Sequence, residues 1–185
     1  DPKTGADIWL LADPSKPRSG RPAPAEGRKP IALLHTPAIE SQGQISPNGK
    51  WLAYYSDESG TAQIYLRLFN GISPASDTKW QLSTSGARGL EPRWRADGKE
   101  LFYLEGVRGT RRIKLMSVPI GAVPNPAGTP KLLFEFQSLP TVQQANVFLY
   151  SPAADGQRFL INVDATEAQP SLEVILNWGK TAGSR

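Results

Sequence analysis

The sequence predicts an all-β fold built from repeated four-stranded antiparallel units. Three observations predict it: a glycine-containing turn motif occurs three times, short apolar segments flank each copy, and no stretch shows the 3.6-residue apolar periodicity of an amphipathic helix. The 17 glycines and 17 prolines among 185 residues are typical of a globular chain rich in turns. No apolar run approaches the roughly 18 to 20 residues of a membrane-spanning helix. We therefore expect no membrane insertion by these residues.

The turn motif first occurs as Ser46-Pro47-Asn48-Gly49-Lys50. It returns as Arg95-Ala96-Asp97-Gly98-Lys99 and around Asp155-Gly156, where Ala153-Ala154 reads as an insertion. Pro or Ala suits the first central position of a type I turn, Asn or Asp the second, and Gly the left-handed position that follows. The motif therefore predicts hairpin turns at Asn48-Gly49, Asp97-Gly98 and Asp155-Gly156. The three glycines are 49 and 58 residues apart, which sets the length of the repeated unit.

Apolar segments on both sides of each turn predict its two strands. The runs after the turns, at 52–55, 101–104 and 159–161, lack polar alternation, which indicates strands buried on both faces. A second group alternates, as half-buried strands do, and a third group closes each unit. The short segments before the turns are 44–45, 93–94 and 149–150; the alternating strands are 7–11, 63–69, 112–118 and 172–178; the closing strands are 30–34, 79–83 and 130–134.

Four strands per unit without helices are typical of a β-propeller blade. We predict a partial β-propeller of about three and a half four-stranded antiparallel blades. Residues 1–37 form the tail of a blade with a long Pro-rich loop, 38–84 and 85–137 are full blades, and 138–185 are a last, three-stranded blade. Full closure of a ring would need partners: missing N-terminal blades of the same parent chain, or a second copy of this one.

These turns, each followed by an apolar strand, resemble the WD40-like propeller repeats of the TolB type, whose blades carry a Ser-Pro-Asp-Gly-Lys turn. More narrowly, Asp7-Ile8-Trp9, Pro92-Arg93-Trp94 and the ending Val174-Ile175-Leu176-Asn177-Trp178 are similar to the C-terminal end of certain propellers in soil bacteria, often acidobacteria. Those propellers follow a Ser/Thr protein kinase domain and a membrane segment. The resemblance implies a sensory or scaffolding propeller, periplasmic or otherwise extracytoplasmic. No kinase motif occurs in these residues.

The composition excludes several kinds of chemistry. The chain has no cysteine, which removes thiol nucleophiles, disulfides and cysteine-based zinc sites. Its single histidine, His35, cannot supply the clustered imidazoles of a zinc hydrolase, and no Gly-x-Ser-x-Gly elbow is present. We therefore expect no catalysis by this segment, no cofactor and no metal.

Candidate binding residues follow from the propeller geometry. The innermost strand of each blade lines the central channel, and the loop leading into it lies on a face where ligands commonly bind. These positions are Glu40, Gln42, Glu91, Arg93 and Asn146. They suit a peptide terminus, a sugar or an ion. The alternative is that they form solvated channel walls and inter-blade hydrogen bonds, because propeller function resides in grafted sites.

A cluster of arginines in the second full blade suggests a different partner. Its members are Arg88, Arg93, Arg95, Arg108, Arg111 and Arg112, with Trp94 among them. Phosphate contact with base stacking would indicate a nucleic-acid groove. Interleaved acidic residues and a net charge of only +4 favour ordinary ion pairs, so nucleic acid is not an expected partner. The alternatives to a protein, peptide or small-molecule binder are a gating propeller of a prolyl-oligopeptidase-like peptidase and an anionic-polymer-binding module.

Overall fold

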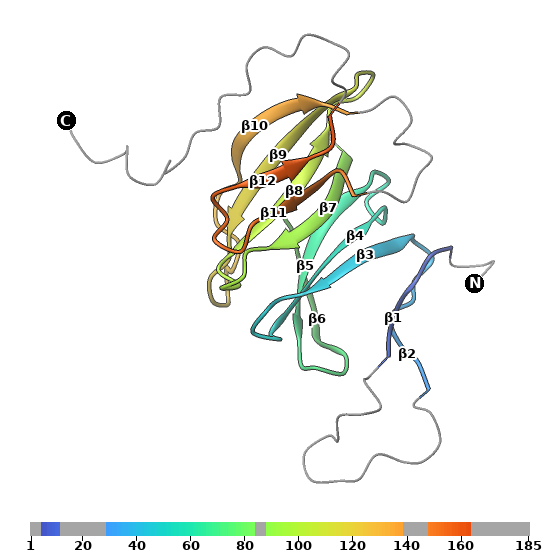
Figure 1. Ribbon diagram of the computed structural model, residues 1–185. Helices are drawn as coiled ribbons and strands as arrows, with labels where there is room; N and C mark the ends of the chain where they lie inside the picture. Colours follow the sequence, from blue (N-terminus) through green and yellow to red (C-terminus); the bar gives the residue numbers. More distant parts are fainter. Residues whose placement is uncertain (1–4, 12–28, 84–87, 139–147, 164–185) are drawn as a thin grey trace.

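The computed structural model describes residues 5–11, 29–83, 88–138 and 148–163. Within these ranges the chain forms strands β1 to β12 and no helix (Figure 1). Two four-stranded sheets stand beside each other, and a two-stranded sheet adjoins each of them. The described residues contain no apolar helix of membrane-spanning length.

The first full blade is the antiparallel sheet β3-β4-β5-β6. Its strands are β3 (Glu40–Ile45), β4 (Trp51–Ser56), β5 (Gln63–Phe69) and β6 (Pro74–Gln81). Every residue of β4 is buried, as its unbroken apolar run predicts. The expectation of a half-buried β5 is wrong, because Ile64 and Leu66 pack toward the second full blade while Tyr65 and Phe69 pack toward β1 and β2.

The second full blade repeats this order as β7-β8-β9-β10. Its strands are β7 (Arg88–Trp94), β8 (Glu100–Gly106), β9 (Arg112–Pro119) and β10 (Lys131–Gln137). On the N-terminal side, β1 (Ile8–Leu10) pairs with β2 (Ile31–Leu34), and on the C-terminal side, β11 (Tyr150–Pro152) pairs with β12 (Phe159–Ile161). The chain is therefore an all-β, partial β-propeller, as predicted.

Apolar side chains fill the interfaces between neighbouring sheets. Between the two full blades, Ala53, Ile64 and Leu66 pack against Leu101 and Val118, all with an exposed fraction of 0%. Comparable clusters join the first full blade to β1 and β2, and the second to β11 and β12. Burying one valine, leucine or isoleucine side chain in this way contributes about 1.5–3 kcal/mol. The blades are thus held together by hydrophobic contact between their faces.

The three predicted hairpin turns are confirmed. Gly49, Gly98 and Gly156 have φ angles of 70°, 69° and 70°, in the left-handed region that favours glycine. Each donates its N–H to the carbonyl three residues earlier, at 2.8–2.9 Å. In the third turn that carbonyl belongs to Ala153, while Pro152 ends strand β11. Ala153-Ala154 is therefore not an insertion, because these residues are the first two positions of the turn.

The preceding Asn or Asp completes each turn in the same way. The side-chain oxygens of Asn48, Asp97 and Asp155 accept the backbone N–H two residues later, at 3.0, 3.0 and 2.9 Å. This local bond offsets the loss of a ladder partner at the turn.

Some strand positions differ from the sequence prediction. Strand β6 begins at Pro74 rather than at residue 79, and the inner strands β3 and β7 begin four or more residues earlier than the apolar segments indicate. Strand β12 is not buried on both faces, since the exposed fraction of Leu160 is 77%. The predicted strand at 172–178 lies outside the described residues.

Candidate ligand pocket

The inner strands of both full blades carry a bulge at the same place. The pairing register shifts between Ser41 and Gln44 in β3, and between Leu90 and Arg93 in β7. At these bulges Gln42 has a φ of 55° and Glu91 a φ of 50°. A left-handed residue other than glycine is uncommon and costs roughly 1–2 kcal/mol, so surrounding contacts must hold it. The candidate residues Gln42 and Glu91 therefore lie within the strands, not in the loops before them.

Each bulged side chain forms a hydrogen bond to the next unit. Gln42 Oε1 accepts the backbone N–H of Glu91 at 2.7 Å. The Glu91 carboxylate in turn accepts the backbone N–H of Leu149, at 3.0 and 3.2 Å. We call this series the bulge relay, made of Gln42, Glu91 and Leu149. It is the inter-blade hydrogen bonding that the sequence analysis left as the alternative role for these positions.

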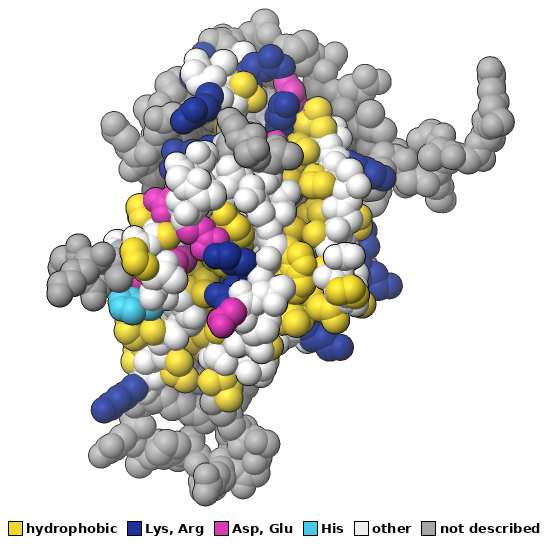
Figure 2. Space-filling view, turned by 180° about the vertical axis from the view of Figure 1, so that it is seen from behind, with side chains coloured by type: hydrophobic (Ala, Val, Ile, Leu, Met, Phe, Trp, Pro, Cys, Tyr) yellow, Lys and Arg dark blue, Asp and Glu magenta, His cyan; other side chains and the backbone are white. Residues whose placement is uncertain are grey.

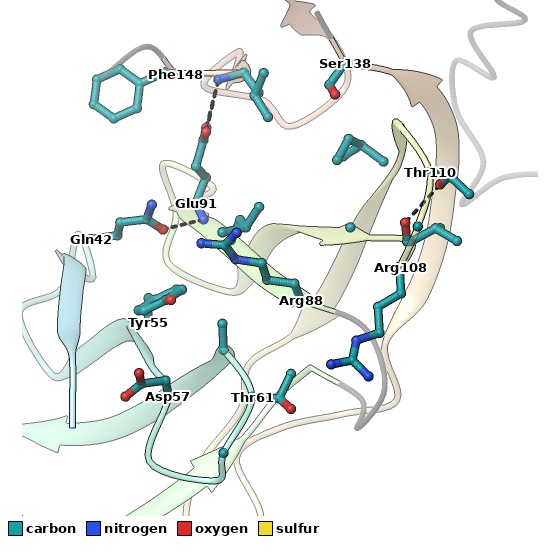
Figure 3. A pocket seen from close by; sticks show the side chains of 18 residues that line it. Gln42, Tyr55, Asp57, Thr61, Arg88, Glu91, Arg108, Thr110, Ser138 and Phe148 are labelled. Carbon is teal, nitrogen blue, oxygen red and sulfur yellow. Dashed lines mark hydrogen bonds between the residues drawn. The ribbon is translucent and has the colours of Figure 1, made fainter. Parts of the chain in front are cut away.

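A half-open pocket of about 980 Å³, here called the inter-blade pocket, lies between the two full blades and is also lined by Phe148 and Leu149 (Figure 3). It lies at the end of the sheets where β3 and β7 begin and where the β4–β5 and β8–β9 hairpins turn. Its lining includes four charged residues: Asp57, Arg88, Glu91 and Arg108. Figure 3 shows Arg88 reaching across the pocket toward the side of Gln42 and Glu91, whereas Arg108 points toward the side of Thr61.

The charged residues of this pocket differ in their pairing. Asp57 Oδ1 accepts the backbone N–H of Ile39 at 2.8 Å. Burial raises the pKa of the Glu91 carboxyl, and this effect exceeds the opposing influence of the Leu149 N–H and of Arg93. Arg88 and Arg108 are exposed, and neither has an ion pair or hydrogen bond among the described residues. The pocket therefore offers two guanidinium groups that have no partner within the described part of the chain.

The other predicted site residues are placed differently. Glu40 is only 1% exposed, accepts a hydrogen bond from the Thr36 hydroxyl, and does not line the pocket. Arg93 lies over the ring of Phe148, 4.2 Å from its centroid, and Phe148 is one of the lining residues of the pocket. Asn146 lies outside the described residues. Tyr55 and Phe148 also line the pocket and were not predicted from the sequence, because neither belongs to a motif.

Two further arginines of the cluster, Arg95 and Arg112, form ordinary ion pairs. Arg95 pairs with Asp97 at 2.8 Å and with Glu100 at 2.6 Å, and Arg112 pairs with Glu135. Figure 2 likewise shows acidic and basic side chains intermixed on the face seen there, beside an apolar band. These contacts match the ion pairs that the sequence analysis favoured.

The single histidine lies apart from the inter-blade pocket. His35 Nδ1 is 3.1 Å from Asp7 Oδ2, and neither residue lines the pocket. Over the described part of the chain, no group of three or more histidine or acidic side chains is arranged to hold a metal ion.

Comparisons with known proteins show similarity to solved propellers. No family model matches the chain, and no curated protein matches it. A putative TolB from Agrobacterium tumefaciens has a TM-score of 0.48 and 15% identity over 59% of this chain. A puromycin-hydrolyzing peptidase from Mycobacterium tuberculosis has a TM-score of 0.46 and 12% identity over 59% of it. TolB from Acinetobacter baumannii has a TM-score of 0.39 and 16% identity over 74% of it.

The chain is short beside these structures. The similarity covers 38% of the Agrobacterium protein, 18% of the peptidase and 41% of the Acinetobacter protein.

Proposed function

We propose that this segment is a non-catalytic β-propeller module that binds a ligand in the inter-blade pocket. The observation that carries the proposal is the pocket itself: about 980 Å³ between two blades, lined by Arg88 and Arg108 without partners among the described residues. Ligand sites are typically concave, about 300–1,000 Å³ in volume, with a few convergent polar groups. The fold alone does not define a function, whereas the chemistry of a specific site can indicate one.

The pocket also has the rigid support that a binding site needs. Gln42 and Glu91 are held by the bulge relay, and Leu90 and Tyr55 extend from the packed interface between the blades. The mouth is formed by two short hairpins with glycines at Gly60 and Gly109. Such a site changes little on binding, which limits the entropy lost with the ligand.

The wider setting is part of the same proposal. The module would serve as a sensory or scaffolding part of a larger extracytoplasmic bacterial protein, for example one with a Ser/Thr kinase domain elsewhere in its chain. The support is the resemblance of the turn motifs and of the Val174–Trp178 ending. An immunoblot of the native polypeptide tests it: a product far above 20.1 kDa is expected, and a product near 20.1 kDa would contradict it.

Amide chemical shifts in the ¹⁵N-labelled full chain test the binding site directly. A library of small acids, amines, sugars and short peptides is added in turn. A true ligand is expected to shift Gly60, Gly106 and Gly109, which line the pocket. The turn glycines Gly49 and Gly98 lie at the opposite end of the strands and serve as internal controls. Shifts confined to those turns, or no shifts with any probe, would contradict the proposed function.

A further inference from the structure

One side of the inter-blade pocket is rich in hydrogen-bond donors. Gln42, Tyr55 and Arg88 all line the cavity, and we call them the donor corner. They come from three strands, β3, β4 and β7, of two blades. The Arg88 guanidinium and the Tyr55 hydroxyl have no hydrogen-bond partner among the described residues. Each can therefore donate to a ligand without first breaking a bond to any described residue.

The bulge relay fixes the direction of the third donor. The Glu91 N–H can pair only with an acceptor, so the Gln42 side chain must present its oxygen to Glu91, as the 2.7 Å bond shows. Its amide NH₂ group then points away from Glu91, and no bond to that group occurs among the described residues. The same contact that joins two blades thus leaves an N–H₂ donor available at the pocket.

We propose that the donor corner binds the carboxylate group of a ligand. This inference rests on the proposed function and names the ligand class of the same pocket. Arg88 provides the planar fork that pairs with both carboxylate oxygens, and Gln42 and Tyr55 add neutral donors. Figure 3 shows Arg88 directed to the side where Gln42 and Glu91 lie, which brings its charge to this corner.

The charge of the pocket gives a phosphate dianion no advantage over a carboxylate. Asp57 and Glu91 line the same cavity as Arg88 and Arg108, so acidic and basic groups are equal in number there. A dianion doubles both the attraction to the two guanidinium groups and the repulsion from the two carboxylates. Removing a dianion from water costs more than removing a monoanion, so the balance favours a carboxylate.

The rim of the pocket suits an apolar group attached to the carboxylate. Phe148 is one of the residues that line the cavity, and it is 66% exposed. Arg93 holds the ring from one side, at 4.2 Å from its centroid. An aromatic or aliphatic group of the ligand would remove the ring from water, which is favourable. Both a small aryl or alkyl acid and the C-terminus of a peptide offer this combination.

Calorimetric titration of the full chain tests the proposal with four probes: phenylacetate, acetyl-Ala-Ala-Phe, the C-terminal amide of that peptide, and inorganic phosphate. We expect at least one of the two acids to bind at least tenfold more tightly than the amide and phosphate do. The two acids distinguish the sources: preference for the peptide indicates a peptide C-terminus, and preference for phenylacetate indicates a small acid. Equal binding of acid and amide, or tighter binding of phosphate, would overturn the proposal.

Substitutions assign the binding to the donor corner. Arg88→Gln is expected to weaken the binding of the preferred acid at least tenfold, and Arg108→Gln is expected to weaken it less than about threefold. Arg158→Gln removes the same charge from the turn end of the last sheet and should change nothing. Equal losses for Arg88→Gln and Arg158→Gln would overturn the assignment. Thermal unfolding of each variant checks that it is folded, and Tyr55→Phe, which removes only a hydroxyl, gives a second test with an expected loss of about threefold.

Failure of this inference is separable from failure of the proposed function. If no acid binds but a neutral or cationic probe shifts the amides of Gly60 and Gly109, the pocket is a ligand site and the carboxylate assignment is wrong. If no probe of any class shifts those amides, both proposals are wrong.

Discussion

The side-chain oxygen of Gln42 accepts the backbone N–H of Glu91, which stands 49 residues later at the same bulge of the next blade. Glu91 repeats the contact toward Leu149, 58 residues further on. These separations equal the spacings of Gly49, Gly98 and Gly156 in the sequence. The bond between blades is therefore a property of the repeat, and it explains why two residues other than glycine adopt left-handed conformations.

Removing the Gln42 acceptor should destabilise the contact between the two full blades. Gln42→Ala leaves the partly buried Glu91 N–H without its partner, which costs about 1–3 kcal/mol of unfolding free energy. Gln42→Gly loses the same bond but relieves the strain of the left-handed conformation. Its loss of unfolding free energy should therefore be smaller by about 1 kcal/mol. Urea unfolding measures both. Equal stability of Gln42→Ala and the parent chain would contradict a role for this bond.

The buried Glu91 carboxyl should make stability depend on pH. Burial raises its pKa above the ordinary value of about 4.5, so the folded chain keeps this proton more tightly than the unfolded chain does. The resulting stability is present below pH 4.5 and is lost as pH rises through the folded-state pKa. Glu91→Gln, which can still accept the Leu149 N–H, lacks this dependence. Relative to Glu91→Gln, the parent chain should lose stability between pH 4 and 7, as followed by urea unfolding; a relative gain would contradict this assignment.

Two turn glycines should respond differently to the same substitution. Gly49 and Gly156 share a φ of 70°, so alanine adds about 1 kcal/mol of backbone strain at either position. An added Cβ meets nothing within 4 Å at Gly49, whereas at Gly156 it lies 2.8 Å from Arg95 Cδ and 3.0 Å from Phe102 Cζ. We expect Gly156→Ala to cost about 1–3 kcal/mol more than Gly49→Ala. Thermal unfolding compares them, and equal losses would show that the third turn can shift away from Arg95.

The Asp97 carboxylate should contribute stability that is lost at low pH. Its hydrogen bond with Arg95 lowers its pKa from 3.8 to about 2, so this stability is present above pH 3.8 and is lost as pH falls through about 2. The side chain is 44% exposed, so solvent screening limits the contribution to about 0.5 kcal/mol. Asp97→Asn should lose this amount at pH 7 and little at pH 2.

The first turn supplies a matched control for that variant. Asn48 already makes the same turn bond, so asparagine is compatible with the turn, and Ser46 stands where the second repeat has Arg95. Asn48→Asp should therefore gain no comparable stability at pH 7. A gain of 0.5 kcal/mol or more would mean that the carboxylate acts through the turn rather than through the ion pair.

Local chemistry explains what the sequence could predict. The turns at Gly49, Gly98 and Gly156 were predictable because their conformation depends on adjacent residues, and strand β4 because its apolar run is unbroken. The first half of β6 was not, since Pro-Ala-Ser-Asp-Thr is polar and becomes a strand only at the edge of a formed sheet. Propensity alone does not anticipate such tertiary pairing.

The candidate pocket was predictable only in part. Gln42 and Glu91 were expected near a binding face, and both line the pocket. Their left-handed conformation was not predictable, because it is stabilised by partners 49 and 58 residues away. Tyr55 resembles any other core aromatic in the sequence, and the position of Phe148 at the rim follows from the packing of β11 against the second full blade.

The two partners in each bond of the bulge relay contribute different chemical groups. The receiving blade supplies only a backbone N–H, which every residue except proline has, while the supplying blade needs one residue with a long side-chain acceptor. A tandem duplication of residues 85–137 would therefore recreate the bond at its new junction without a further mutation. Lengthening this propeller through duplication of that unit is thus expected to cost less stability than duplication of a unit whose corresponding position carries a hydrocarbon side chain, as Leu149 does.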